Sequence, residues 1–308
     1  MKAVVLTGYG DVTKLDFTEV EEPNPGPRQI KVKVAGAGVN PVDWKIRRGD
    51  LRTILPLQLP TILGRDVSGE VVAVGTEVTE FQVGDRVMGL VEHGYAEVVV
   101  GSTDSFALLP SEIEIDQAAA IPLVGLAGMQ LIDEGVGVHA GEKVLVTGAV
   151  GSVGRVAVFT AKRRGAQVIA GVRATQREEA EKLEADDIVA LDDPADIRRL
   201  PQVDAIADTV DGKVLEALLD KVRHGGVVGT VLEPPLGAEQ QGLRVHAILA
   251  HRDPQKLVEL GEAVVKGELL LPIDRRFPLH EARTAQNLAE AGGVGKILLV
   301  PTGAERAT

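Results

Sequence analysis

The sequence contains no cysteine among its 308 residues. Disulfides, thiolate nucleophiles and cysteine-ligated zinc are therefore excluded. Histidine is also scarce, and no two histidines have the close spacing typical of a metal-binding pair. We therefore expect no bound metal ion. The six histidines are His93, His139, His224, His246, His251 and His280.

Positive charge is the second shortage. There are 33 Lys and Arg residues against 45 Asp and Glu, which gives a formal net charge of −12. A nucleic-acid-binding protein normally presents a basic face that neutralises phosphates, so no nucleic-acid partner is expected. The densest basic runs, Lys45–Arg48 and Lys162–Arg164, are more typical of solvated faces.

Signals for export or membrane insertion are also missing from the sequence. The run Met1–Leu6 has neither the length nor the cleavage pattern of a signal peptide. No apolar stretch is expected to reach the length that spans a bilayer. These absences favour a cytoplasmic protein without a membrane partner.

The composition is that of a globular protein of about two domains. Hydrophobic residues make up 44% and charged residues 25% of the chain, which is enough apolar material for sizeable cores. In the first third, valine-rich runs alternate with Gly, Pro and Asp, which predicts β-strands. The expected strands are Ala3–Thr7, Gln29–Gly36, Asp66–Val74 and Ala96–Val100.

The pattern changes near Ile115, where an Ala- and Leu-rich segment from Asp116 to about Gly135 predicts a helix interrupted at Pro122. Strands and helices then alternate, which is typical of a parallel sheet with helices on both faces. The expected strands are Lys143–Thr147, Gln167–Val172, Val203–Thr209, Val227–Val231 and Arg244–Ala250, and the helices are Ser152–Arg164, Arg177–Leu183, Lys213–Arg223 and Asp253–Lys266.

The tail differs again, with expected strands at Ile273–Phe277 and Lys296–Val300 around a helix at about Glu281–Ala291. We interpret the tail as a return to the first domain. The sequence therefore predicts an α/β protein in which a Rossmann-type, doubly wound parallel sheet domain (residues 120–267) is inserted into a β-rich domain (residues 1–119 and 268–308).

A glycine-rich turn is the most specific chemical motif. The predicted strand Lys143–Thr147 runs straight into Gly148, and a predicted helix follows. Missing side chains let the backbone approach a pyrophosphate, and the helix N-terminus offers free N–H groups. The alternative is a tight turn without a ligand. The candidate cofactor-binding residues here are Gly148, Ala149, Gly151, Ser152, Val153 and Gly154.

The end of the second predicted strand of this domain carries a cofactor signal of its own. An acidic residue there would bind the ribose hydroxyls of NAD, but this chain has Arg173, with Arg177 one helical turn later. A guanidinium suits the 2′-phosphate of NADP(H). The alternative is that both arginines pair on the surface with Glu178, Glu179 or Glu181.

Several ordered blocks together resemble one family, the quinone oxidoreductases, which form a zinc-independent branch of the medium-chain dehydrogenase/reductases. The similarity covers nearly the whole chain, so it is more specific than any single block. The blocks are Gly38–Gly49, which resembles G-V-N-P-x-D-x-K-x-R-x-G, together with Pro60–Val71, Val83–Val87, Gly94–Glu97, Ala118–Leu123 and Gly295–Leu299.

This resemblance implies that the β-rich domain is a GroES-like catalytic domain, that the cofactor lies between it and the Rossmann domain, and that hydride comes from NADPH. It also implies that Asp208, Thr209 and Val210 lie beside the nicotinamide ribose. Lys296 is a candidate cofactor contact from the returning tail, and a surface lysine is the alternative.

The departures from related families concern zinc and the cofactor pocket. Zinc-dependent alcohol dehydrogenases have a cysteine ligand where this chain has Asn40, and their histidine–glutamate pair aligns with Arg65 and Asp66. Zinc-assisted alcohol oxidation is therefore not expected. Many quinone oxidoreductases also have threonine at the position of Ala127 and tyrosine near Leu191, so the packing of the cofactor pocket is expected to differ.

Three residues of the first block are the catalytic candidates. Asn40 is the first candidate to donate a hydrogen bond to an oxygen that gains charge, and the alternative is a turn residue before Pro41. Asp43 is expected to fix the loop rather than to donate protons. Trp44 forms either an aromatic wall for a planar acceptor or part of the domain core. Tyr95 is a further possible proton donor, but a structural role is favoured.

The sequence leaves two functions open. The first is an NADPH-dependent reductase of quinones or α,β-unsaturated carbonyl compounds, and the second is a non-catalytic NADPH-binding protein of the crystallin-like kind. A homodimer is also expected, because Leu243–Ala250 resembles the edge strand through which members of this family pair. The alternative is that the predicted helix Asp253–Lys266 covers this edge.

Overall fold

The computed structural model describes residues 1–210 and 212–301. The chain divides into two compact units. Unit 1 comprises Met1–Leu123, Arg252–Gly267 and the segment from Leu271 onward, and unit 2 comprises Val124–His251 and Glu268–Leu270.

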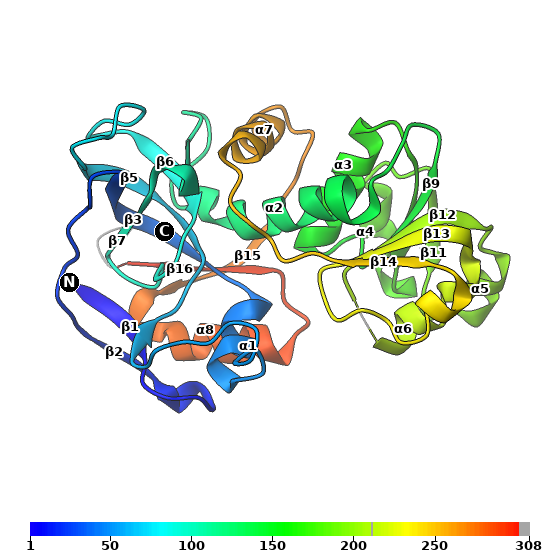
Figure 1. The fold of residues 1–308 in the computed structure, drawn as a ribbon, viewed down its shortest axis with the longest axis horizontal. Coiled ribbons are helices and arrows are strands. Elements are labelled where there is room, and N and C mark those ends of the chain that lie inside the picture. Colours follow the sequence, from blue (N-terminus) through cyan, green and yellow to red (C-terminus); the bar gives the residue numbers. More distant parts are fainter. Residues whose placement is uncertain (211, 302–308) are drawn as a thin grey trace. The chain divides into compact units, whose positions relative to one another are not determined.

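Unit 1 is the β-rich unit, and most of its strand pairs are antiparallel (Figure 1). The strands run in the order β15-β16-β3-β5-β6-β8, β7 also pairs with β3, and a smaller sheet has the order β2-β1-β4. The strands are β1 (Lys2–Leu6), β2 (Leu15–Glu19), β3 (Gln29–Val39), β4 (Thr61–Ile62), β5 (Asp66–Val74), β6 (Arg86–Leu90), β7 (Val98–Ser102), β8 (Phe106–Leu108), β15 (Ile273–Pro278) and β16 (Lys296–Val300).

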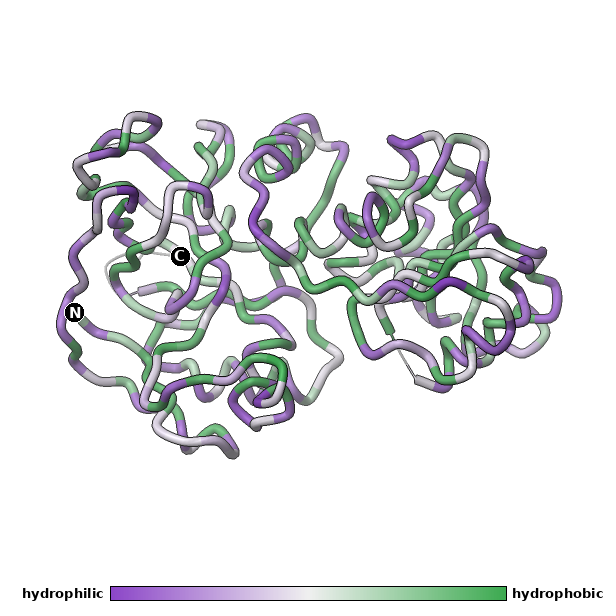
Figure 2. The backbone as a smooth tube through the Cα atoms, viewed as in Figure 1, coloured by the Kyte–Doolittle hydropathy of each residue, from purple (hydrophilic) through white to green (hydrophobic). Residues whose placement is uncertain are grey.

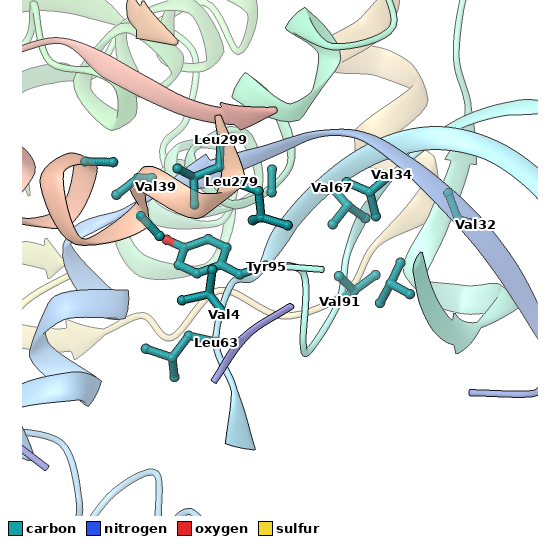
Figure 3. Close-up of a cluster of buried hydrophobic side chains, with 14 of the residues drawn as sticks. Val4, Val32, Val34, Val39, Leu63, Val67, Val91, Tyr95, Leu279 and Leu299 are labelled. Carbon is teal, nitrogen blue, oxygen red and sulfur yellow. The ribbon is translucent and has the colours of Figure 1, made fainter. Parts of the chain in front are cut away.

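The core of unit 1 is formed by Val, Leu and Ile side chains that alternate along the strands, as the period of two requires. Figure 3 shows Tyr95 in this core, with its ring in the same cluster as Val4, Leu63 and Leu279. The tight packing explains Gly64, because a Cβ there would lie 2.4 Å from the Tyr95 ring. Tyr95 is therefore a core residue, as the sequence favours.

Helices α1 (Pro41–Arg48), α7 (Pro254–Val265) and α8 (Ala282–Ala291) complete unit 1. The boundary drawn from the sequence at residue 267 differs from this division, because α7 packs against β6 and β8. Gly261 of α7 faces Met88 and Pro110 at a distance that leaves little room for a side chain. The hydrophobic face of α7 thus places residues 252–267 with unit 1.

Unit 2 is a parallel six-stranded sheet. Its order, β11-β10-β9-β12-β13-β14, is 3-2-1-4-5-6 when the strands are counted within the unit, which is the Rossmann order. The strands are β9 (Lys143–Thr147), β10 (Gln167–Val172), β11 (Asp187–Ala190), β12 (Val203–Asp208), β13 (Val222–Thr230) and β14 (Arg244–Ala247). The predicted fold class is confirmed in both units.

Both faces of this sheet are covered, so its strands are apolar on both sides. Figure 2 accordingly colours much of the sheet as hydrophobic. Val144, Val146 and Val168 belong to the cluster that includes α3, and Leu145 and Ile206 belong to the cluster on the other face. The helices are α2 (Pro122–Gln130), α3 (Ser152–Arg163), α4 (Arg177–Glu181), α5 (Pro194–Arg199) and α6 (Gly212–Glu216), with a π-helical turn at Leu131–Val136 after α2.

One predicted helix of unit 2 is wrong in its second half. The segment expected to be helical from Lys213 to Arg223 contains α6 and a short 3₁₀ turn at Leu219–Lys221, and β13 already begins at Val222. Val222 is 5% exposed and pairs with Val203 of β12. Tertiary pairing of a buried valine therefore overrides the helical pattern.

The expectation that no apolar stretch has membrane-spanning length is also wrong. Residues Gln117–Val136 form a run of helical turns with a mean hydropathy of 1.3, long and apolar enough to qualify. In the structure 83% of the most apolar window is buried. The mostly buried core helix of a soluble protein passes the same test of length and composition.

Candidate active site

The glycine turn of unit 2 has the geometry that the sequence predicts. Gly148 follows β9 with a φ of 61°, which favours glycine, and α3 begins at Ser152. A Cβ on Gly154 would collide with the carbonyl oxygen of Gly148, so only glycine allows the helix to start this close to the strand. The first N–H groups of α3 have no acceptor inside the helix. Such a terminus is suited to a phosphate.

The other candidate positions of this turn divide by exposure. Ala149 is fully buried and donates its N–H to the carbonyl of Gly171 on β10, so it fixes the turn. Gly151 is exposed, and Ser152 and Val153 are partly exposed. The backbone from Gly151 to Val153 is therefore the accessible part of the turn.

A buried hydrogen-bond network ties the turn to the neighbouring strands. The Asp208 carboxylate accepts from the hydroxyls of Thr147 at 2.7 Å and Thr230 at 3.0 Å, at the carboxyl ends of β12, β9 and β13. The Thr209 hydroxyl donates to the Thr147 carbonyl at 2.7 Å. Asp208 is fully buried, and its hydrogen bonds hold the ends of the three strands together. Val210, in contrast, is 42% exposed.

The two candidate arginines have different surroundings. Arg173 is exposed at the end of β10, and nothing in residues 1–210 and 212–301 accepts a hydrogen bond from its guanidinium. The Arg177 guanidinium donates to Asp196 and to the Ile188 carbonyl. Neither arginine pairs with the glutamates considered above, and Glu179 pairs with Arg155. Arg173 is thus available for a phosphate, and Arg177 already has a structural role.

In unit 1, three buried polar side chains meet where β3, β5 and β16 lie side by side. The Lys296 ammonium donates to Asp66 Oδ2 and to Asn40 Oδ1, both at 2.7 Å. The Asn40 amide nitrogen donates to the same Asp66 oxygen at 2.8 Å. Lys296 is 5% exposed, so the alternative of a surface lysine is wrong.

Asp43 lies next to this cluster and is also buried. Its Oδ2 accepts from the Asn40 backbone N–H and from the Tyr95 hydroxyl, both at 2.8 Å. Burial raises the pKa of Asp43 to about 6, although both hydrogen bonds oppose the shift. The bond to Asn40 closes the first turn of α1, which agrees with the predicted loop-fixing role.

Trp44 is half-buried on α1, with the charged groups of Lys45 and Arg48 over its ring at 5.8 Å and 5.7 Å. Its indole nitrogen is buried and has no partner in the described part of the chain. The ring is therefore only partly buried, and two cationic groups lie over it. Its role as an aromatic wall stays a prediction.

Comparison with known proteins agrees with this architecture. Residues 26–114 match the family model described as the alcohol dehydrogenase GroES-like domain, and residues 183–299 match the one described as zinc-binding dehydrogenase. A quinone oxidoreductase of Pseudomonas aeruginosa is 30% identical over 97% of this chain and 99% of its own length. The chain belongs to the quinone oxidoreductase family. It is therefore placed among the oxidoreductases.

Solved structures of the quinone oxidoreductase family support the same assignment. The enzyme from Coxiella burnetii is 30% identical, with a TM-score of 0.87 over 97% of this chain and 99% of its own. The Escherichia coli quinone oxidoreductase, solved in complex with NADPH, is 27% identical, with a TM-score of 0.85 over 98% of this chain and 100% of its own.

The residues of this family member do not fit the zinc that the second family model implies. At the positions of the alcohol dehydrogenase cysteine and histidine–glutamate pair, this chain has Asn40, Arg65 and Asp66. The Lys296 ammonium donates to oxygens of Asn40 and Asp66, and Arg65 cannot ligate a metal. Within the described residues no group of three or more His, Asp or Glu side chains is suited to a metal.

Sequence reasoning missed the Asp66–Lys296 pair and the two threonines that bind Asp208. Asp66 and Lys296 are separated by 230 positions, so only the strand order brings them together. Their residue types were a usable signal, because an acid at the first position of an apolar strand needs a partner once it is buried. Thr147 and Thr230 are each the last residue of a strand, where polar side chains line the ligand side of an open α/β sheet.

Proposed function

We propose that the protein is an NADPH-dependent reductase that transfers hydride to quinones or α,β-unsaturated carbonyl compounds without a metal ion. The observation that carries this proposal is the accessible glycine turn at the start of α3, together with Arg173 at the end of β10, whose guanidinium has no partner among the described residues. Gly151, Ser152 and Val153 would hold the pyrophosphate, and Arg173 the 2′-phosphate. When bound, the cofactor supplies the hydride.

The protein's own contribution is binding, orientation and charge. Hydride transfer to a quinone or an enone places negative charge on a carbonyl oxygen, and a fixed donor or cation nearby lowers the barrier. The buried cluster of Asn40, Asp66 and Lys296 is the polar group of unit 1 that supports this chemistry. Asp43 of α1 accepts a hydrogen bond from the Asn40 backbone N–H, and the Tyr95 hydroxyl donates to Asp43 in turn.

The test is an NADPH oxidation assay over a panel of quinones, enones and enals, together with a direct measurement of NADPH binding. We expect turnover with at least one class of acceptor. Tight NADPH binding without turnover of any acceptor would instead support the non-catalytic NADPH-binding protein.

The proposed independence from metal has its own test. Asn40 Oδ1 and Asp66 Oδ2 are occupied by an ammonium, so we expect chelators to leave turnover unchanged and elemental analysis to find no stoichiometric zinc. Loss of turnover on chelation, restored by added zinc, would refute the metal-free mechanism.

We further propose that the protein forms a homodimer through β14 and works in the cytoplasm without a nucleic-acid or membrane partner. β14 lies at the end of the sheet order and pairs with β13, so its other edge has no strand beside it in the described chain. The net charge of −12 and the burial of Gln117–Val136 support the rest. Cell fractionation tests the location, and a membrane-bound fraction would count against it.

A further inference from the structure

The Asn40 amide has no donor left for a substrate. Its Nδ2 carries two hydrogens, and it donates to Asp66 Oδ2 at 2.8 Å and to the Gly38 carbonyl at 3.3 Å. Its Oδ1 accepts from Lys296, and the residue is 1% exposed. The residue that the sequence favours as hydrogen-bond donor to the acceptor is therefore committed inside unit 1.

The Lys296 ammonium, in contrast, has one N–H donor without an acceptor among the described residues. An ammonium carries three donors, and two of them go to Asn40 Oδ1 and Asp66 Oδ2. No third acceptor is found in residues 1–210 and 212–301. Lys296 is only 5% exposed, and a buried N–H donor without an acceptor costs free energy. A water or a ligand oxygen therefore has to accept the third hydrogen bond.

The position of this ammonium is fixed by side chains on three neighbouring strands. Lys296 is the first residue of β16, which pairs with β3, and Asp66 is the first residue of β5, which pairs with β3 at Gly38. A Cβ on Gly38 would collide with the Asp66 carboxylate. The other Asp66 oxygen accepts from the Leu123 N–H at 2.5 Å. A charge that is held in place before the reaction needs no reorganisation during it.

We propose that Lys296, and neither the Asn40 amide nor a metal ion, donates the hydrogen bond to the carbonyl oxygen of the acceptor. The inference rests on the proposed reductase function. When bound, NADPH would supply a hydride to the conjugated carbon or the quinone ring and would leave as NADP⁺. The electron pair displaced from the π bond would then move onto the oxygen that accepts from Lys296. A solvent proton then completes the hydroquinone or the saturated carbonyl product. Asn40 and Asp66 are positioning residues for Lys296.

The first arm of the test removes the ammonium without leaving a lone buried charge. In the double variant Lys296→Met/Asp66→Asn we expect kcat to fall by about 10²–10³-fold, the usual loss for one donor to a developing oxyanion, with NADPH affinity retained. The matched control is Lys296→Arg, which keeps a cation with N–H donors beside Asp66 and should lose much less. A double variant that melts cooperatively, binds NADPH and keeps a kcat near wild type would overturn the proposal.

The second arm replaces the side chain by a soluble ion. Lys296→Ala is prepared and assayed with ethylammonium, which carries N–H donors, or with tetramethylammonium, which carries charge but no donor, at equal ionic strength. We expect only ethylammonium to raise kcat. If it restores the melting temperature but not kcat, Lys296 is purely structural and the inference is wrong.

Failure of the two proposals can be told apart. A wild-type protein that binds NADPH but reduces no acceptor refutes the reductase function and this inference together. A wild type that turns over, beside a folded double variant that turns over equally well, refutes only the role of Lys296.

Discussion

Arg173 is the residue on which the expected cofactor preference depends. Its guanidinium is exposed and unpaired within the described chain, so binding a 2′-phosphate would break no existing ion pair. A charge-assisted contact contributes about 1.5–3 kcal/mol, or roughly tenfold to over a hundredfold in affinity. Arg173→Asp should therefore erase or reverse the ratio of NADPH to NADH affinity.

The matched control for this variant is Arg177→Gln. Arg177 already donates to Asp196 and Ile188, so its loss should lower the thermal midpoint and leave the cofactor ratio nearly unchanged. Binding constants for both cofactors, measured by fluorescence titration, decide the point. If Arg177→Gln shifts the ratio and Arg173→Asp does not, another residue reads the phosphate.

Asp43 makes a residue-scale prediction about pH. Burial raises its pKa to about 6 in the folded protein, against 3.8 as the ordinary value. As the pH rises through this window the unfolded chain releases its proton first, so the folded state is destabilised, by about 2 kcal/mol between pH ~4.5 and pH ~7. Above the folded pKa both states are ionised, and the effect is constant.

Urea unfolding of wild type and Asp43→Asn over this range measures the effect. The amide retains an acceptor for Asn40 and Tyr95 but cannot ionise, so its stability should be higher relative to wild type at neutral pH than at low pH. Parallel pH profiles for the two proteins would show that Asp43 does not titrate in this window.

At the scale of elements, the strand–turn–helix unit around Gly148 could be predicted from the sequence almost to the residue. β9 and β10 have the predicted bounds, and α3 ends one residue earlier than expected. The reason is local: an apolar strand, three glycines at fixed spacing and an amphipathic helix specify one turn. Helix α1 was missed although Asn40, Pro41 and Asp43 are typical of a helix start.

What the sequence could not predict depends on contacts between distant strands. The start of β13 at Val222 requires its partner Val203, and the Asp66–Lys296 pair requires the order of β5, β3 and β16. Composition and periodicity report burial along one segment but not which segment supplies the partner. The sequence could therefore name Asn40, Asp43 and Trp44 as candidates from one block, but it could not predict which groups the Asn40 side chain binds.

The glycine turn itself supports an element-scale prediction. A Cβ on Gly154 would meet backbone atoms of Gly148 and Ala149, so Gly154→Ala should cost about 1–3 kcal/mol of stability, as overpacking does. Gly151 has a φ of −69°, is exposed, and would place a Cβ 3.1 Å from the Gly148 carbonyl oxygen. Gly151→Ala should therefore keep most of the stability but weaken NADPH binding.

Chemical denaturation and NADPH titration of the two variants separate these effects. The expected pattern is a stability loss that is larger for Gly154→Ala, and a selective affinity loss for Gly151→Ala. Unchanged NADPH affinity in a stable Gly151→Ala protein would show that the pyrophosphate does not approach this part of the turn.

At the scale of the whole molecule, the open edge of β14 bears on assembly. An uncovered strand edge favours pairing with another chain, and a twofold axis would satisfy both edges at once. The Ile248 N–H donates to the Thr230 carbonyl on β13, so by alternation the N–H of Ala247 faces the open side. Ala247→Pro should remove an intermolecular donor and leave the bonds within the chain intact. Light scattering should find a dimer for wild type and a shift toward monomer for Ala247→Pro, with Ala247→Ser as the control that keeps the N–H and stays dimeric. A monomeric wild type, or an Ala247→Pro protein as dimeric as the control, would rule out pairing through β14.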